Sequence, residues 1–348
     1  MTSDYTTGVR SDYAIEVQGL TKRFGDFTAV DNITFNVNHR EIFGFLGPNG
    51  AGKSTTIRML CTLARPSGGD AKVNGFDLIR QPDQVRASIG LVSEKMIMYD
   101  QLTAAENLRF FGNLYQMPKP KIERKIDELL GLVNMSQWKN AQIKTYSTGM
   151  RQRINVIRAL LTEPQIIFMD EPTLGLDPQT TLSIRQLIRD INKAGTTVIL
   201  TTHAMIEAEA LSDRVAIIDH GRIVALDTPA DLKKLIKEAD MTVFSARIPN
   251  LTPFLVEKIK ALDCVAAIDQ PDAYDLKISA RGSEGFDRII DTIRHEGGNI
   301  TMINTNEPTL EDVFLSVTGK AMRDQVEKSK SSGMRRRGPW GRPQARVR

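Results

Sequence analysis

One stretch of eight residues, Gly-Pro-Asn-Gly-Ala-Gly-Lys53-Ser54, has the residue types and spacing that bind phosphate groups. It fits the pattern G-x-x-x-x-G-K-[ST] and stands between an apolar run and a helical stretch, as the mechanism requires. The glycines let successive backbone N–H groups point inward, and a helix N-terminus adds a favourable field. Lys53 would reach the β- and γ-phosphates, and Ser54 would hold Mg²⁺. The stretch predicts a nucleoside triphosphate site.

A second stretch, Ile-Ile-Phe-Met-Asp170-Glu171, predicts a buried strand that ends in two carboxylates. Asp170 is suited to a metal ion, and Glu171 to orienting or deprotonating an attacking water. By itself, an apolar run that ends in Asp-Glu is also typical of an ordinary strand end. Because the same chain contains Lys53 and Ser54, we interpret this stretch as the hydrolytic half of the site.

Alternating strands and helices are expected to position both stretches. Strand patterns cover residues 14–17, 33–37, 42–46, 165–169 and 197–201, and helical patterns cover residues 54–63, 102–132 and 180–193. Pro118 and Pro120 should interrupt the pattern of residues 102–132. The alternation predicts an α/β sheet with buried parallel strands.

The composition changes near residues 237–240, and a second series of elements follows. Strand patterns at 241–248, 265–268, 275–279 and 299–303 combine with helical patterns at 253–262 and 285–295. The order β-α-β-β-α-β is that of a small ferredoxin-like unit. Residues 312–317 are expected to add a closing helix.

The charge of the chain is unevenly distributed. The 348 residues, enough for two or three domains, contain 46 Lys and Arg against 42 Asp and Glu, a net charge of +4. Residues 320–348 alone hold ten basic and two acidic side chains, a net charge of +8, so residues 1–319 carry −4. The basic isoelectric point therefore reflects a tail, and we do not expect the body of the protein to bind nucleic acid.

Several classes of protein do not fit this composition. The two cysteines, Cys61 and Cys264, and the four scattered histidines lack metal-ligand spacing, which argues against a disulfide framework or a zinc site. No apolar run approaches 18 residues, and the polar N-terminus lacks the apolar region of a secretory signal. We expect a protein of the reducing, cytosolic side.

Four further features carry a family resemblance. Tyr146-Ser147-Thr-Gly-Met150 lies just before Asp170, with Ser147 23 residues upstream, and resembles the signature motif of ABC ATPases, usually Leu-Ser-Gly-Gly-Gln. Leu176-Asp177 resembles the D-loop, His203 the switch histidine, and Phe24 the aromatic residue that stacks on adenine. The resemblance covers residues 13–235, with every motif in order.

The resemblance implies a fold class and a division of the chain. The expected fold is an α/β P-loop NTPase (ABC ATPase) domain with antiparallel β and α-helical subdomains, followed by a small α+β ferredoxin-like domain. The predicted parts are an N-terminal arm (1–12), the nucleotide-binding domain (13–235), an accessory or regulatory domain (241–319) and a basic, disordered tail (320–348).

The resemblance also implies residue roles in a head-to-tail homodimer, in which each ATP lies between one P-loop and the signature of the other subunit. Glu171 and His203 would be catalytic. Mg²⁺ would contact Ser54, Glu94 and Asp170. The residues expected to contact ATP are Phe24, Gly47, Pro48, Asn49, Gly50, Ala51, Gly52, Lys53, Ser54, Thr55, Ser147, Thr148, Gly149, Met150 and Asp177.

Three positions depart from the family pattern. Thr148 replaces the second glycine of the signature, and Arg40 occupies a hairpin turn that often contains glycine. Glu94 stands where the family has the glutamine of the Q-loop. A carboxylate is a good ligand for Mg²⁺ but adds negative charge beside the γ-phosphate. We hypothesise that Glu94 keeps the metal contact.

Residues 307–319 resemble the closing motif of ATPase subunits of the daunorubicin-resistance and sodium-export type, which pair with a separate permease. Residues 96–99, Met-Ile-Met-Tyr, would contact that permease, or alternatively belong to the core of the helical subdomain. The domain after residue 241 would support the dimer or sense a small molecule.

The resemblance thus implies a Mg²⁺-dependent ATPase subunit that drives export from the cytoplasmic face of the membrane. A soluble ABC ATPase acting on nucleic acid or ribosomes is an alternative, although only one nucleotide domain and no long coiled coil are present. An importer subunit is another alternative, because its ATPase motifs are the same. The tail, residues 328–348, is expected either to contact anionic lipid or to be solvated without a partner.

Overall fold

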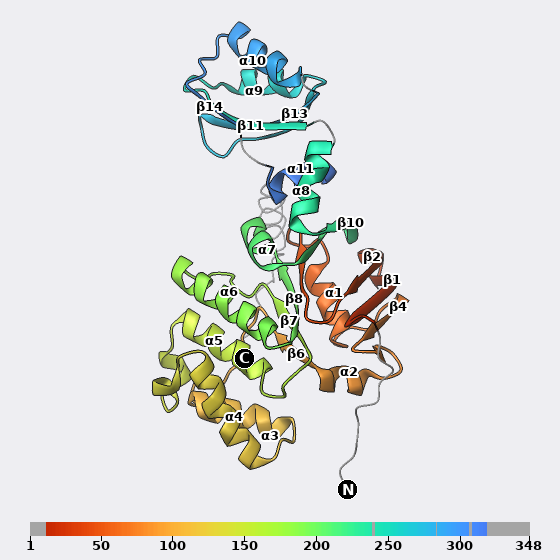
Figure 1. The fold of residues 1–348 in the computed structure, drawn as a ribbon, viewed down its shortest axis with the longest axis vertical. Helices are drawn as coiled ribbons and strands as arrows, with labels where there is room; N and C mark the ends of the chain where they lie inside the picture. Colours follow the sequence, from red (N-terminus) through yellow and green to blue (C-terminus); the bar gives the residue numbers. More distant parts are fainter. Residues whose placement is uncertain (1–11, 239–240, 283, 306–307, 319–348) are drawn as a thin grey trace, which may run out of the picture.

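The computed structural model describes residues 12–238, 241–282, 284–305 and 308–318. The predicted tail, and the predicted arm except for Asp12, lie outside these residues. The described chain forms a six-stranded sheet and two four-stranded sheets, flanked by helices (Figure 1). The predicted α/β fold is confirmed.

The six-stranded sheet has the order β10-β9-β3-β8-β7-β6 and is parallel except for β10. Its strands are β3 (Ile42–Leu46), β6 (Ile89–Val92), β7 (Ile166–Asp170), β8 (Thr197–Thr202), β9 (Arg214–Asp219) and β10 (Arg222–Asp227). Strands β3 and β8 are buried at every residue, as expected for a parallel sheet that is covered on both faces.

Strand β7 separates two apolar cores. Ile166 and Phe168 pack in a core with α1 (Lys53–Leu60), whereas Ile167 and Met169 pack in a core with α5 (Thr148–Ala159) and α6 (Pro178–Lys193). Because side chains alternate along a strand, α1 and α5 lie on opposite faces of the sheet (Figure 1).

An antiparallel sheet of order β2-β1-β4-β5 shares the core of α1. It consists of β1 (Ile15–Phe24), β2 (Phe27–Val37), β4 (Gly68–Val73) and β5 (Phe76–Asp77), and α2 (Pro82–Ser88) follows it. The two strand patterns predicted here correspond to parts of β1 and β2, whereas β4 and β5 were not predicted.

The helical subdomain lies on the other side of β7. The pattern of residues 102–132 is divided into α3 (Ala104–Leu114) and α4 (Lys119–Leu132), with Pro118 as the N-cap of α4. Two 3₁₀ turns, η1 (Ser136–Trp138) and η2 (Ile143–Thr145), lead to α5. The prolines therefore interrupt the helix as predicted, because proline fits the first turn of a helix but not its interior.

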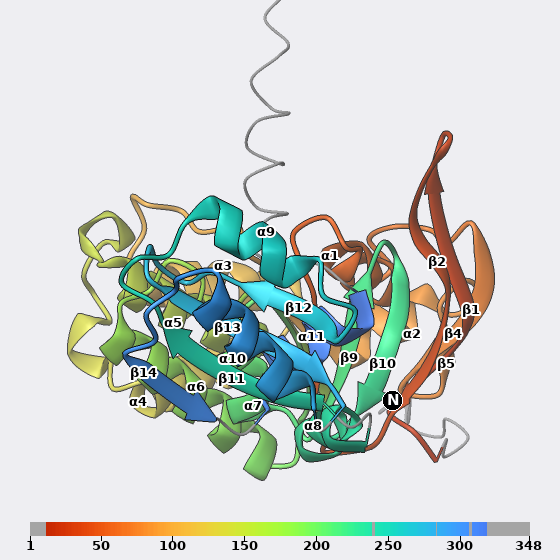
Figure 2. The ribbon, with the colours of Figure 1, turned by 90° about the horizontal axis from the view of Figure 1, so that it is seen from above.

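The accessory sheet has the antiparallel order β12-β13-β11-β14. The chain order is β11 (Met241–Arg247), α9 (Pro253–Lys260), β12 (Val265–Asp269), β13 (Asp275–Arg281), α10 (Gly285–His295) and β14 (Met302–Thr305). This is a β-α-β-β-α-β series. Helices α9 and α10 cover the face that points away from the six-stranded sheet (Figures 1 and 2).

The last described helix, α11 (Leu310–Thr318), packs against elements around the six-stranded sheet. Its Val313 and Phe314 share a buried core with residues of β9, α7 (Met205–Leu211) and α8 (Pro229–Glu238). Its Asp312 pairs with Lys277 of β13, at 2.9 Å between Nζ and Oδ1. Helix α11 therefore joins both parts of the chain, and the domain limits predicted at residues 235 and 241 stay a prediction.

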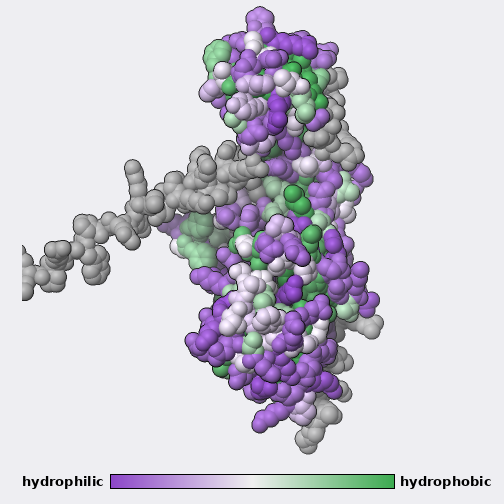
Figure 3. All heavy atoms as spheres, turned by 90° about the vertical axis from the view of Figure 1, so that its left-hand side faces the viewer, coloured by the Kyte–Doolittle hydropathy of each residue, from purple (hydrophilic) through white to green (hydrophobic). Residues whose placement is uncertain are grey.

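Within the described ranges, no helix is both long and apolar enough to span a membrane. On the face in Figure 3, hydrophobic side chains form small groups among hydrophilic ones.

The buried packing of α11 predicts that two Phe→Ala variants differ strongly in their free energy of unfolding. Phe314 is completely buried, so Phe314→Ala should lower the free energy of unfolding by about 3–5 kcal/mol. The matched control Phe254→Ala removes a ring that is 62% exposed and should cost less than about 1 kcal/mol. Urea unfolding followed by circular dichroism compares the two, and equal midpoints would contradict the packing of α11.

Candidate nucleotide site

The loop between β3 and α1 has no room for a Cβ atom at two positions, so both must be glycine. A Cβ atom on Gly47 would lie 2.2 Å from the carbonyl oxygen of Ile218, and one on Gly52 would lie 2.6 Å from that of Ala29. Gly52 also has a φ of 109° at the N-cap of α1, a conformation that other residues rarely adopt. The loop is therefore held close to the sheet, with the start of α1 directed at the site.

Lys53 is buried in this loop, with 5% of its surface exposed. Its Nζ donates to the carbonyl oxygens of Gly47 (2.6 Å) and Pro48 (3.2 Å) and lies 3.5 Å from Oε1 of Glu171. Burial lowers the pKa of Lys53, and the carboxylates of Glu171 and Asp170 partly oppose this. The ammonium group is thus held where the loop would receive phosphates.

Asp170, at the end of β7, contacts two hydroxyl groups. Ser54 Oγ donates to its Oδ1 at 2.9 Å, and Thr201 Oγ1 donates to the same atom at 2.6 Å. Thr201 is in register with Asp170 in the parallel β7–β8 pair. The adjacent oxygens of Ser54 and Asp170 fit Mg²⁺, which takes one or two protein ligands and completes its shell with water and phosphate.

The structure brings together Glu171 and His203, the two residues expected to be catalytic. Oε2 of Glu171 lies 2.9 Å from Nδ1 of His203, the residue after β8. Glu171 has a φ of +50°, and its N–H donates to Thr201 O at 3.1 Å. This strained backbone, anchored on β8, turns the carboxylate into the site. The hydrogen bond to Glu171 raises the pKa of His203, although burial opposes the shift.

The signature residues lie at the start of α5, where they contact α6. Ser147 caps α5 and accepts a hydrogen bond from the N–H of Met150 at 3.3 Å. A Cβ atom on Gly149 would lie 2.6 Å from Cγ2 of Thr180. Asp177 caps α6 and accepts from the N–H (2.9 Å) and hydroxyl (2.6 Å) of Thr180. The predicted signature and D-loop therefore meet at Thr180, and these two hydrogen bonds lower the pKa of Asp177.

The structure does not bring the signature to the phosphate loop of its own chain, because α5 and α1 occupy opposite faces of the sheet. Ser147, Thr148 and Asp177 are exposed to solvent. The signature is thus available to a second molecule.

Two other predicted site residues, Phe24 and Glu94, lie outside this cluster, and Arg40 lies in the turn before β3, at the opposite end of that strand from the phosphate loop. Phe24 ends β1, is 55% exposed, and has Nζ of Lys22 4.9 Å from its ring centre. Glu94 follows β6 at the edge where β7 ends, and within the described part of the chain it makes no hydrogen bond or ion pair. Arg40 has a φ of +61°, which explains why glycine suits this turn.

Two polar contacts of the site were not predicted. Besides Thr201, Glu207 on α7 is 1% exposed and accepts a hydrogen bond from Thr173 Oγ1 at 2.6 Å. This bond ties the segment after Glu171 to the segment after His203. The available sequence signal was a carboxylate four residues after His203 in a short helical stretch.

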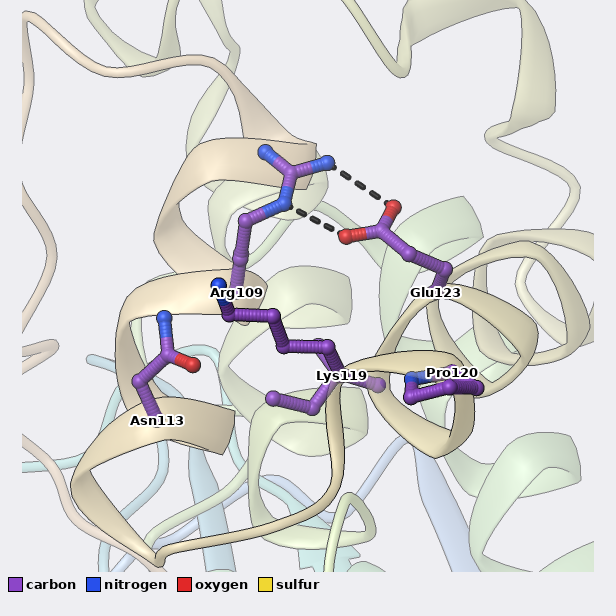
Figure 4. Close-up of a pocket in the computed structure, with 6 residues that line it drawn as sticks. Arg109, Asn113, Lys119, Pro120 and Glu123 are labelled. Carbon is purple, nitrogen blue, oxygen red and sulfur yellow. Dashed lines mark hydrogen bonds and ion pairs between the residues drawn. The ribbon is translucent and has the colours of Figure 1, made fainter.

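A separate cavity of about 370 Å³ lies between α3 and α4 (Figure 4). It is lined by Arg109, Asn113, Lys119, Pro120, Ile122 and Glu123. Arg109 forms a two-pronged ion pair with Glu123, at 2.6 and 2.9 Å. None of these lining residues belongs to the predicted nucleotide site.

The Glu171–His203 contact makes a prediction about protonation. The pairing favours the imidazolium form, so its contribution to stability is present below pH 6.5 and is lost as the pH rises through the higher pKa of His203. Glu171→Gln should therefore lower that pKa, as measured by an NMR titration of the four histidine side chains. The signals of His39, His220 and His295 serve as controls, and an unchanged His203 titration would contradict the contact.

The chain is similar to known proteins over most of its length. Residues 30–174 match the ABC transporter family. The linearmycin resistance ATP-binding protein of Bacillus subtilis is 32% identical, with 89% of this chain and 100% of that protein covered. The daunorubicin/doxorubicin resistance ATP-binding protein of Streptomyces peucetius is 35% identical (90% and 94% covered). The Nod factor export ATP-binding protein I of Ralstonia nicotianae is 34% identical (91% and 97% covered).

Solved structures resemble the nucleotide-binding part. The cbiO1 protein of Clostridium perfringens, part of the ABC transporter complex cbiONQ, is 25% identical with a TM-score of 0.60 and covers 66% of this chain and 95% of its own. An ATP-binding cassette dimer in a post-hydrolysis state, bound to ADP and Pi, is 26% identical with a TM-score of 0.56. It covers 62% of this chain and 98% of its own. This chain belongs to the ABC transporter family of ATP-binding proteins.

Proposed function

We propose that this protein is the ATP-hydrolysing subunit of an exporter, working as a head-to-tail homodimer with a separate permease. The observation that carries the proposal is the convergence of Lys53, Ser54, Asp170, Glu171 and His203 at the ends of β3, β7 and β8. The relatives named for drug resistance and Nod factor export support the direction of transport.

ATP binding would exchange the contacts of Lys53. Its ammonium group leaves the carbonyl oxygens of Gly47 and Pro48 for the β- and γ-phosphates, which are stronger partners for a buried cation. Ser54 and Asp170 would hold Mg²⁺, which neutralises charge on the phosphate oxygens when bound. Glu94 is proposed as a further metal contact, as the sequence predicted.

Hydrolysis would depend on Glu171. Once Lys53 has moved to the phosphates, the Glu171 carboxylate is free to orient the attacking water and take its proton. Nδ1 of His203 holds the other oxygen of Glu171 and fixes the direction of the carboxylate. The anchored backbone of Glu171 supports the same orientation.

The second copy of the chain would supply Ser147, Gly149 and Met150. The N-terminus of α5 is an exposed, capped helix end, which suits a γ-phosphate from the partner. Moving a two-state element from 1:99 to 99:1 takes about 5.5 kcal/mol of differential binding. Two ATP molecules, each held between a phosphate loop and a signature, can supply it.

Two variants should separate binding from hydrolysis. Glu171→Gln should bind ATP, lose at least about 100-fold in kcat because the base is gone, and accumulate an ATP-bound dimer in size-exclusion chromatography. Lys53→Ala should weaken ATP binding at least about tenfold and form no such dimer. Normal turnover by Glu171→Gln would exclude Glu171 as the base.

An exposed apolar surface beside the site is proposed as the permease contact. Ile97 is 59% exposed and Tyr99 47%, and the Tyr99 ring packs against Phe110, which is 40% exposed, with 4.8 Å between ring centres. Met98 instead packs against the core of the helical subdomain. Ile97 and Tyr99 thus support the permease contact, whereas Met98 supports the alternative that this segment belongs to the core of the helical subdomain.

Cysteine crosslinking tests this surface, because both native cysteines are buried. Ile97→Cys should crosslink to a co-expressed permease in membranes. The control Leu63→Cys, at a side chain that is 57% exposed near the end of α1, should not. Absence of a crosslink from position 97 in every nucleotide state would contradict the contact.

Such a contact would place the protein peripherally at the cytoplasmic face of the membrane. Selection of the substrate would rest with the permease. The importer role and the nucleic-acid role are weaker alternatives, because the names of the relatives described above refer to resistance and export. The lipid contact of residues 328–348 stays a prediction.

A further inference from the structure

Three polar side chains are buried in a row on the signature helix α5. Gln152, Asn155 and Arg158 are 4%, 0% and 9% exposed, and their spacing of three residues places them on one helix face. They lie beside the apolar core that contains Ile154 and Ile157. We call these three residues the α5 ladder.

The ladder is a continuous chain of hydrogen bonds. Arg158 Nη2 donates to Asn155 Oδ1 at 3.0 Å, and Asn155 Nδ2 donates to Gln152 Oε1 at 3.3 Å. Because every donor points toward the N-terminus of α5, the bonds polarise one another in one direction. Gln152, the last acceptor of the ladder, is therefore the ladder residue nearest the signature.

Each ladder residue also donates to the backbone of another segment. Gln152 Nε2 bonds to Pro172 O at 2.7 Å, and Pro172 directly follows the proposed base Glu171. Asn155 Nδ2 bonds to Ser93 O at 3.1 Å, directly before Glu94. Arg158 Nη2 reaches Leu91 O in β6 at 3.4 Å.

The ladder is costly as a purely structural element. Arg158 has no carboxylate partner among the described residues, and its Nε lacks a hydrogen-bond partner there. Burial lowers its pKa, and the guanidinium lies 4.8 Å from the ring centre of Phe111. Apolar side chains of similar volume commonly give equal or greater stability at such sites.

We propose that Gln152, Asn155 and Arg158 are positioning residues, which hold the segments after Glu171 and before Glu94 in fixed register with the signature. This rests on the proposed ATPase function. In one chain, the base at Glu171 serves its own ATP, and the signature serves the partner's ATP. Because α5 links the two regions rigidly, binding of the partner's ATP at the signature would align Glu171 with the ATP of its own chain.

Asn155→Asp is the most informative variant. The new carboxylate still accepts from Arg158, and an ion pair there compensates the buried cation. It has no hydrogen to donate to Ser93 O or Gln152 Oε1, so the link to the segment before Glu94 and the ladder bond to Gln152 are both lost. Gln152→Met is a second variant, which removes the bond to Pro172 O at similar side-chain volume.

The matched control is Asn192→Leu on α6. Asn192 Nδ2 donates to Arg40 O at 2.8 Å and Thr196 O at 3.1 Å, so this variant also removes an Asn anchor between a helix and backbone carbonyls. It lies outside the proposed catalytic and binding machinery.

The full-length variants are compared by hydrogen–deuterium exchange, ATP affinity and steady-state ATPase kinetics. Asn155→Asp and Gln152→Met should each exchange at least tenfold faster in their anchored segment, residues 93–95 and 173–176 respectively, with unchanged exchange in residues 47–54. Their kcat should fall at least tenfold while the Kd for ATP stays within twofold. Asn192→Leu should change neither kcat nor the Kd for ATP by more than twofold.

The outcomes distinguish the two proposals. Unchanged exchange in the anchored segments, or faster exchange with normal kcat, overturns the ladder. A parallel loss of ATP affinity and kcat also overturns it, because that result indicates general damage. If the unmodified protein hydrolyses no ATP, the proposed function fails, and the exchange data still decide whether the ladder holds these segments.

Discussion

Strand β7 must be buried on both faces, and the rest of the structure depends on this constraint. Its apolar residues separate the core of α1 from the core of α5 and α6. Its parallel pairing with β8 then places Asp170 opposite Thr201 and the Glu171 backbone against β8. One strand thus aligns Asp170, the proposed metal ligand, with Glu171, the proposed base, and it keeps the phosphate loop and the signature on opposite sides of one chain.

Because the two parts are separated in one chain, a second copy is needed to bring a signature to each phosphate loop in the proposed dimer. The signature lies on an exposed helix end that is braced by Gly149 against Thr180, and Asp177 caps the neighbouring helix through the same Thr180. Both sets of side chains are organised before any partner arrives. A second molecule can therefore complete the site without extensive reordering of the signature.

The sequence predicted what is encoded locally. The phosphate loop, the strand ending at Asp170 and the helical pattern at residues 180–193 depend on short patterns, and all are present in the structure. Strands β4 and β5 were missed because the Gly-rich, polar run at residues 68–73 has little strand propensity and is held by pairing with β1. Similarly, Thr201, Glu207 and Asn155 acquire their roles only through contacts between distant segments.

In the proposed dimer, the signature of one chain binds the nucleotide held by the other chain. The most direct test of this arrangement mixes two inactive variants, Lys53→Ala and Ser147→Asp. The aspartate in Ser147→Asp still caps α5, but it directs a negative charge at the phosphate of the partner's ATP. A mixed dimer has one site with an intact Lys53 and an intact Ser147. Mixing equal amounts should restore ATPase activity that neither variant has alone, to at most about half of the unmodified value, because each mixed dimer has one intact site of two. No restored activity, or full activity of either variant alone, would contradict it.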